Sequence, residues 1–324
     1  MTKFRKFFLI IFFVALIWLM YSSYNNWSSL TQIQLTKINY EWFILAFCFT
    51  ALDNFFDYKS WIHYLKRAFY LNNKNLKHKI LPNIFIASFA SDLLPAKMGT
   101  FSRPFILKEI LGLRMKEGIS VHLNALFSDF FAAMLICFVG LFYWGYTLFN
   151  IFIVLLCFFS VMLTIILILR VATLQGYIQR TIRLFFPAES VTGIIDLQNS
   201  IYNLFTKQDF FITLTIKLCS WIAMGLCLYS VVKALDYNIL LIECIFMVTI
   251  SSILGMLSFL PGGLIVAEAS LLGFFLLLNI PINTAIITIF IYRIFSFWEW
   301  VILGNLVVQF YLPKTITPHN KPLI

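Results

Sequence analysis

Charged side chains interrupt several of the long apolar runs in this sequence, and they are the residues that could carry chemistry. If these runs cross a bilayer, a charge near the bilayer centre costs about 3 kcal/mol or more, so each charge needs a partner or a function. Both signs occur, as expected for groups that meet in one polar interior. The candidates for lining such a polar, ligand-binding interior are Asp53, Asp57, Asp92, Lys97, Arg103, Asp129, Glu268 and Arg293.

The types of these residues indicate what they could bind. Arg103 is the best candidate for a phosphate, because a guanidinium is always charged and can donate two parallel hydrogen bonds. Asp53 and Asp57 lie four residues apart and therefore share one helix face. Together with Glu268 they could bind a cationic group or take up a proton. The alternative is a static network of ion pairs that holds helices together.

Two Pro/Gly breaks in short apolar segments resemble each other. Pro95 and Gly99 form the first break, and Pro261, Gly262 and Gly263 form the second. Arg103 follows the first proline by eight residues and Glu268 follows the second by seven, and the breakers Gly112 and Asn279 end the second arms. The pattern predicts two interrupted helical hairpins, as found at transporter sites near the midplane. Simple kinks in membrane helices are the alternative.

The composition identifies the elements that must position these residues. The chain has 324 residues, of which 61% are apolar and 12% charged, with a mean hydropathy of +0.90. Apolar runs near the length of a membrane helix, without the short alternation of barrel strands, predict a helical integral membrane protein. A nucleic-acid-binding protein, a disulfide scaffold and a disordered chain are excluded. The scattered histidines and cysteines predict no metal, and no cofactor motif is present.

We therefore predict an all-α polytopic membrane protein with six full spans plus two broken or re-entrant helical hairpins related as an inverted repeat. Residues 1–324 form a single transmembrane domain, with halves at about 42–143 and 210–310 and a cytoplasmic amphipathic segment at about 171–207. The second hairpin, 240–260 and 264–280, could instead be two complete helices. The full spans are expected at 7–20, 42–64, 119–143, 148–169, 210–232 and 282–310.

The basic residues predict the orientation. Lys and Arg cluster in a few short segments between the apolar runs, which places these segments and both termini on the cytoplasmic side of the cytoplasmic (inner) membrane. Residues 7–20 could be a signal peptide, but no good cleavage site follows, so an uncleaved first helix fits better.

The sequence resembles the lysylphosphatidylglycerol synthase transmembrane-region family, also called flippase-like (UPF0104-type) membrane proteins. The likeness is carried by Pro95-x-x-x-Gly99-x-x-x-Arg103 and by Leu260-Pro261-Gly262-Gly263-Leu264-x-x-x-Glu268-Ala269, and Ala285 and Arg293 fit the second-half pattern. Ala96-Lys97 and Thr100 depart from the family pattern in the first motif. Carried over by position, the matching charged residues are Arg103, Glu268 and Arg293.

The resemblance implies a role with anionic phospholipids or polyprenyl-phosphate-linked sugars as lipid partners. A lipid flippase is the first hypothesis. The second is a non-catalytic membrane subunit that recruits a cytosolic glycosyltransferase or aminoacyl-lipid synthase, and the third is a membrane-embedded enzyme acting on lipid phosphate. Family members that synthesise aminoacyl-lipids carry a separate cytosolic catalytic domain, so we expect no enzyme activity from this chain alone. Homodimer formation stays open.

Overall fold

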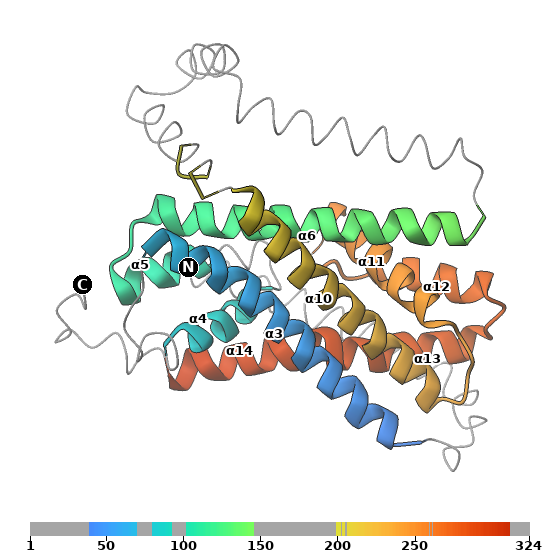
Figure 1. The fold of residues 1–324 in the computed structure, drawn as a ribbon. Coiled ribbons are helices and arrows are strands. Elements are labelled where there is room, and N and C mark those ends of the chain that lie inside the picture. The colour runs from blue at the N-terminus through green and yellow to red at the C-terminus, as the bar shows by residue number, and fades with distance from the viewer. Residues whose placement is uncertain are drawn as a thin grey trace.

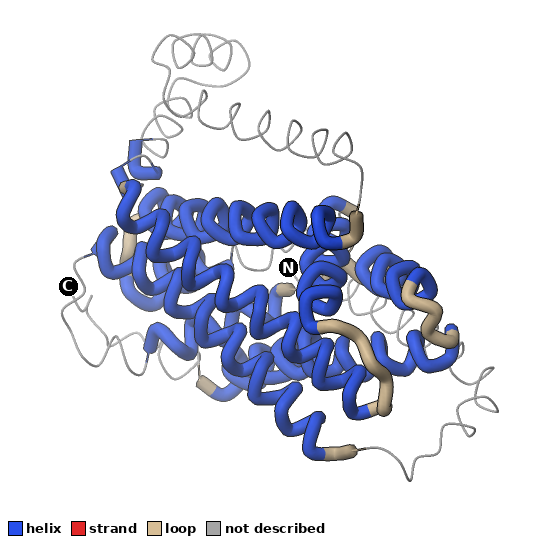
Figure 2. The backbone as a smooth tube through the Cα atoms, turned by 45° about the vertical axis from the view of Figure 1, so that its right-hand side comes forward, coloured by secondary structure: helices blue, strands red, loops and turns tan. Residues whose placement is uncertain are grey.

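The computed structural model describes residues 39–69, 80–92, 102–145, 199–201, 203–204, 206–258, 260 and 262–311. Helices joined by turns make up this part of the chain, and it contains no strand (Figures 1 and 2). The predicted helical class is confirmed. The expected spans 7–20 and 148–169, and most of the amphipathic segment 171–207, lie outside the described residues.

The described helices fall into two series with the same order of long and short elements. The first series is α3 (Glu41–Phe69), α4 (Leu81–Ser88) with the 3₁₀ turn η3 (Phe89–Ser91), α5 (Ser102–Leu111) and α6 (Met115–Tyr143). The second series is α10 (Lys207–Ala234), α11 (Leu241–Leu257), α12 (Val266–Leu277), α13 (Ile282–Arg293), the π-helical η5 (Ile294–Trp298) and α14 (Glu299–Phe310).

Three described helices are long and apolar enough to cross a membrane: Met115–Tyr143, Lys207–Ala234 and Ile282–Phe310. They correspond to three of the six expected spans. The fourth long helix, α3, has 29 residues and would extend about 43 Å. It is less apolar because Asp53, Asp57 and Lys59 all lie in its central part.

Local sequence signals explain where the helices begin and end. Asn39 Oδ1 accepts a hydrogen bond from the Glu41 backbone N–H at 3.1 Å, and Thr206 Oγ1 accepts one from the Asp209 N–H at 3.3 Å. Gly112, with φ 68°, follows α5, and Asn279, with φ 59°, follows α12. Both predicted breakers therefore adopt the left-handed backbone that stops a helix.

The second hairpin consists of two short arms. Helix α11 has 17 residues and α12 has 12, so they extend about 25 Å and about 18 Å. Both are shorter than the hydrocarbon core of about 30 Å. The interpretation of residues 240–280 as two complete spans is therefore wrong for this structure, because α11 already ends at Leu257, before the Gly262–Gly263 turn.

The two short-helix pairs lie toward opposite ends of α6, with α4 and α5 at one end and α11 and α12 at the other (Figure 1). Each pair packs on a long helix of the other series: α4 and η3 contact α14, and α11 contacts α6. Gly304 permits the first contact, since a Cβ there would lie 2.5 Å from the Ala90 backbone nitrogen. Helices α3 and α10 pack along each other between the two pairs.

Candidate functional site

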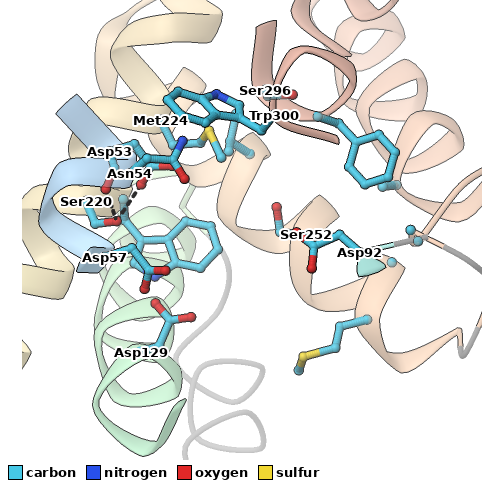
Figure 3. A pocket seen from close by; sticks show the side chains of 18 of the residues that line it. Asp53, Asn54, Asp57, Asp92, Asp129, Ser220, Met224, Ser252, Ser296 and Trp300 are labelled. Atoms are coloured by element: carbon cyan, nitrogen blue, oxygen red, sulfur yellow. Dashed lines mark hydrogen bonds between the residues drawn. The ribbon is translucent and has the colours of Figure 1, made fainter. Parts of the chain in front are cut away.

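A cavity with several charged side chains in its wall lies where the two series meet. Its volume is about 190 Å³, and its walls come from α3, α5, α6, α10, α11, α12, α13 and α14 (Figure 3). Because a single water needs roughly 10–15 Å³ on this measure, the space is sufficient for a hydrated polar group. The carboxylates of Asp53, Asp57 and Asp129 lie on one side of the cavity, and that of Asp92 lies on the other (Figure 3).

Most of the charged residues that the sequence singled out come together here. Those lining the cavity are Asp53, Asp57, Asp92, Arg103, Asp129 and Arg293, and Gly262 and Gly263 of the second break also line it. Glu268 is not in the wall, but it binds Arg293, which is. Pro95, Lys97, Gly99 and Pro261 lie outside the described residues.

The first charge cluster joins four helices around Asp57. One carboxylate oxygen of Asp57 forms an ion pair with Lys217 Nζ, and the other lies 3.2 Å from Arg103 Nη2. Lys217 also lies 3.5 Å from Asp129 Oδ1. The Lys217 side chain is only 6% exposed, so these carboxylates replace the water that its ammonium group has lost.

Arg103 is held from several directions. Its Nε donates to Ser88 Oγ at 2.9 Å, and its guanidinium carbon lies 4.2 Å from the centre of the Phe85 ring. Only 3% of the residue is exposed. The residue predicted to hold a phosphate therefore already has a carboxylate, a hydroxyl and an aromatic face as partners, which ties α5 to α3 and α4.

Asp53 differs from its neighbour Asp57. Its Oδ1 accepts a hydrogen bond from the Ser220 hydroxyl, as the dashed contact in Figure 3 shows. Within the described part of the chain, no lysine or arginine lies at ion-pair distance from it. Asp53 is thus the carboxylate of this cluster that carries no basic partner.

The second charge cluster consists of Glu268 in the first turn of α12 and Arg293 at the end of α13. Arg293 Nε donates to Glu268 Oε1, and the guanidinium carbon lies 5.5 Å from the centre of the Phe297 ring. The atoms Arg293 Nη2 and Glu268 Oε2 are buried without a hydrogen-bond partner among the described residues. Arg293 therefore keeps one donor available beside the cavity.

A polar column extends from the first cluster toward the ends of α3 and α10 that carry Arg67 and Asp209. The hydroxyls of Tyr64, Ser128 and Thr213 contact one another at 2.8–3.2 Å, and each of the three residues is fully buried. Beyond them, Asp209 forms ion pairs with Arg67 and with His63 Nε2, the latter at 2.9 Å.

Lys217, Ser220 and the hydroxyl column were not among the site residues predicted from the sequence. Lys217 carried a usable signal, since a lysine well inside the apolar run 210–232 needs an acidic partner for the same reason as the other intramembrane charges. Ser128, Thr213 and Ser220 carried no such sequence signal, because serine and threonine are common at ordinary contacts between membrane helices.

The arrangement suits the binding of a charged group that enters and leaves. The cavity wall contains more carboxylates than basic groups, and Arg293 in the same wall has a donor that no described residue uses. The basic residues of the cavity wall, Arg103, Lys217 and Arg293, each have an acidic partner. An anionic ligand would therefore compete for Arg293, while protons or cations would compete for the carboxylates.

Comparison with known proteins assigns the chain to a family. The sequence profile of the lysylphosphatidylglycerol synthase transmembrane region matches residues 7–304. A UPF0104 membrane protein from Methanocaldococcus jannaschii is 23% identical over 225 residues, which cover 69% of this chain and 94% of that protein. No solved structure matches the sequence. The chain is therefore a membrane protein of the lysylphosphatidylglycerol synthase transmembrane-region family.

Proposed function

We propose that the protein is a flippase that moves the headgroup of an anionic phospholipid through the cavity while the acyl chains stay in the bilayer. A polyprenyl-phosphate-linked sugar presents the same phosphate chemistry and is the other candidate cargo. The chain binds and moves the lipid without transforming it, so we assign no catalytic residue. We also propose the cytoplasmic membrane as its location, with both termini on the cytoplasmic side.

One observation carries the proposal: a cavity lined by residues of both short-helix pairs contains an arginine with a donor that no described residue uses. Arg293 Nη2 is buried and unpartnered among the described residues, and a lipid phosphate is the kind of acceptor that it lacks. The exposed faces of the surrounding helices are apolar, with Phe47, Phe55, Leu135 and Val139 among the large exposed side chains. Such faces suit contact with acyl chains.

The order of the helices supports an inverted repeat behind this function. Each half contains a long helix, a pair of short helices and a second long helix, and each short pair packs on a long helix of the other half. In transporters built this way, alternating access comes from movement of one half against the other around a shared site. We propose that the two halves of this chain also move against each other around the cavity.

The test uses the purified full chain in phosphatidylcholine vesicles that contain a trace of NBD-labelled phosphatidylglycerol. Dithionite reduces only the label in the outer leaflet. The rate at which the remaining label is then lost therefore measures movement of lipid from the inner to the outer leaflet. We expect the protein to accelerate this exchange, and we expect Arg293→Gln to reduce the rate at least tenfold. A polyprenyl-phosphate-linked sugar with the same label, tested in parallel, distinguishes the two cargoes.

Arg114→Gln provides a matched control, because it also breaks an arginine–glutamate pair. Arg114 pairs with Glu117 near the start of α6, and its side chain is 72% exposed, away from the cavity wall. Its rate should equal that of the unaltered protein. Folded protein that leaves both labelled lipids in place overturns the proposal. If that protein instead binds a cytosolic glycosyltransferase or synthase, the membrane-subunit hypothesis replaces it.

A further inference from the structure

Asp53 stands out among the acidic groups of the cavity wall because no lysine or arginine of the described residues lies at ion-pair distance from it. Lys217, the nearest basic group on α10, contacts Asp57 and Asp129 instead. Arg103 contacts Asp57 and Ser88. An ionised carboxylate removed from water without a cation is costly, and a proton is the smallest cation that can neutralise it.

The surroundings of Asp53 on every neighbouring helix leave this conclusion unchanged. Asp57 lies one turn away on α3, Lys217 and Ser220 face it from α10 together with the thiol of Cys227, and Asp129 approaches from α6. Tyr292 lies near Asp53 on α13, and its neighbour Arg293 is paired with Glu268. Asp53 therefore lies beside Asp57 and Asp129 as well as Lys217, whose ammonium group is engaged by those two carboxylates.

A metal ion fits this position less well than a proton. Asp57 and Asp129 are engaged by Lys217, so Asp53 and Ser220 offer one carboxylate and one hydroxyl, far fewer than the six or more oxygen ligands of a calcium site. The Ser220 hydroxyl donates its hydrogen to Asp53 Oδ1. A hydroxyl that binds a metal would instead direct its oxygen lone pairs at the ion.

Two polar helix faces connect Asp53 with the ends of α3 and α10. Residues three or four apart share a helix face, and the polar residues on both helices follow that spacing. On α3 they are Asp53, Asp57, Ser60, Tyr64 and Arg67, and on α10 they are Asp209, Thr213, Lys217 and Ser220. The hydroxyl contacts of Tyr64, Ser128 and Thr213 lie between the cavity and the pair of Asp209 with His63.

From this placement we propose that Asp53 is a proton-binding site whose protonation is coupled to lipid movement, and that protons reach it from the α3–α10 polar column. Asp53 takes up one proton to become a neutral acid and returns to the carboxylate when it releases that proton. A phosphate entering beside Arg293 adds negative charge to the cavity, and the proton offsets it, so anion and proton move in the same direction. This inference rests on the proposed flippase function.

The experiment imposes a pH gradient on the labelled-phosphatidylglycerol vesicles. With one proton per lipid, a gradient of about one pH unit should shift the final ratio of inner to outer label about tenfold, with lipid accumulating away from the acidic side. A protonophore should abolish the shift. Asp53→Asn should remove the gradient dependence, because an amide cannot exchange this proton.

The exposed Asp236→Asn is the matched control for the same chemical change. Asp236 lies at φ 61°, a conformation that asparagine also adopts, so the gradient response should be retained. Ser220→Ala provides a second variant if Asp53→Asn does not fold. It removes the hydrogen bond to the charged carboxylate, so the exchange rate should respond to pH at a higher midpoint.

The outcomes separate the two proposals. Proton coupling is overturned if lipid exchange does not depend on the pH gradient, or if the dependence persists in Asp53→Asn. Either result is compatible with the flippase function. A response to a sodium gradient alone also overturns it. Folded protein that exchanges no lipid under any gradient overturns both.

Discussion

Lys217 of α10 forms an ion pair with Asp57 of α3, and the contact lies inside the bundle rather than at its surface. The same ammonium group lies 3.5 Å from Asp129 of α6, so one lysine links three long helices. Burying these charges is costly unless each keeps its partners. The cavity wall therefore depends on the full set of pairs.

Replacing Lys217 alone should strongly destabilise the protein. Lys217→Met leaves Asp57 with Arg103 only and leaves Asp129 without its basic contact, which should cost about 3–5 kcal/mol. The thermal unfolding midpoint in detergent measures the loss. The double variant Asp57→Asn/Lys217→Met removes both charges of the ion pair and should recover part of the lost stability. A double variant less stable than the sum of its single changes would contradict a pairing role.

A methyl group at Gly304 should loosen the packing of α14 on α4. The Cβ of Gly304→Ala would lie 2.5 Å from the Ala90 backbone nitrogen and 2.8 Å from the Ile86 carbonyl oxygen, so the helices must separate, at a cost of about 1–3 kcal/mol. Gly273→Ala on α12 is the control, since nothing lies within 4 Å of its Cβ. That change should stabilise its helix slightly. Equal midpoints for the two variants would refute the close approach.

Gly263 should tolerate alanine less well than another glycine with the same backbone. Gly263 has φ 66° and Gly145 has φ 70°, so both substitutions strain the backbone by about 1–2 kcal/mol. A Cβ on Gly263 would also lie 3.1 Å from the backbone of Gly255, whereas Gly145 faces open space. We expect the lower unfolding midpoint for Gly263→Ala. A larger effect at Gly145 would show that α11 and the turn are less tightly packed.

Tyr64→Phe should cost about 1 kcal/mol, because the hydroxyls of Ser128 and Thr213 lose a shared partner but keep their own 2.8 Å contact. Tyr40→Phe, at a residue that is 65% exposed, is the control and should leave the unfolding midpoint unchanged. If both variants behave alike, the buried hydroxyl contacts contribute nothing measurable to stability.

The sequence was most informative at residues whose burial in an apolar segment costs free energy. Asp53, Asp57, Asp129 and Arg293 were identified because charges inside apolar runs need partners, and they do line one cavity. Gly112 and Asn279 were correctly predicted as helix ends from their tolerance of positive φ.

Which groups pair could not be deduced from spacing along the chain. Arg103 and Asp57 are 46 residues apart, and Lys217 and Asp57 are 160 apart, so these contacts depend on how the helices pack. The length of α11 was overestimated for a related reason. The apolar run continues to Leu260, but the helix stops where the glycine turn must pass close to Gly255.

The π-helical turn η5 divides the final membrane-spanning helix into two segments, α13 and α14, which pack against different helices. Helix α13 packs on α12 and α10, whereas α14 packs on α4 and η3. A π-helical turn inserts an extra residue into the helical repeat, and such turns are common at working sites. Since Arg293 immediately precedes it and Trp300 follows, both in the cavity wall, we expect rotation about this joint to change the width of the cavity while the crossing itself stays continuous.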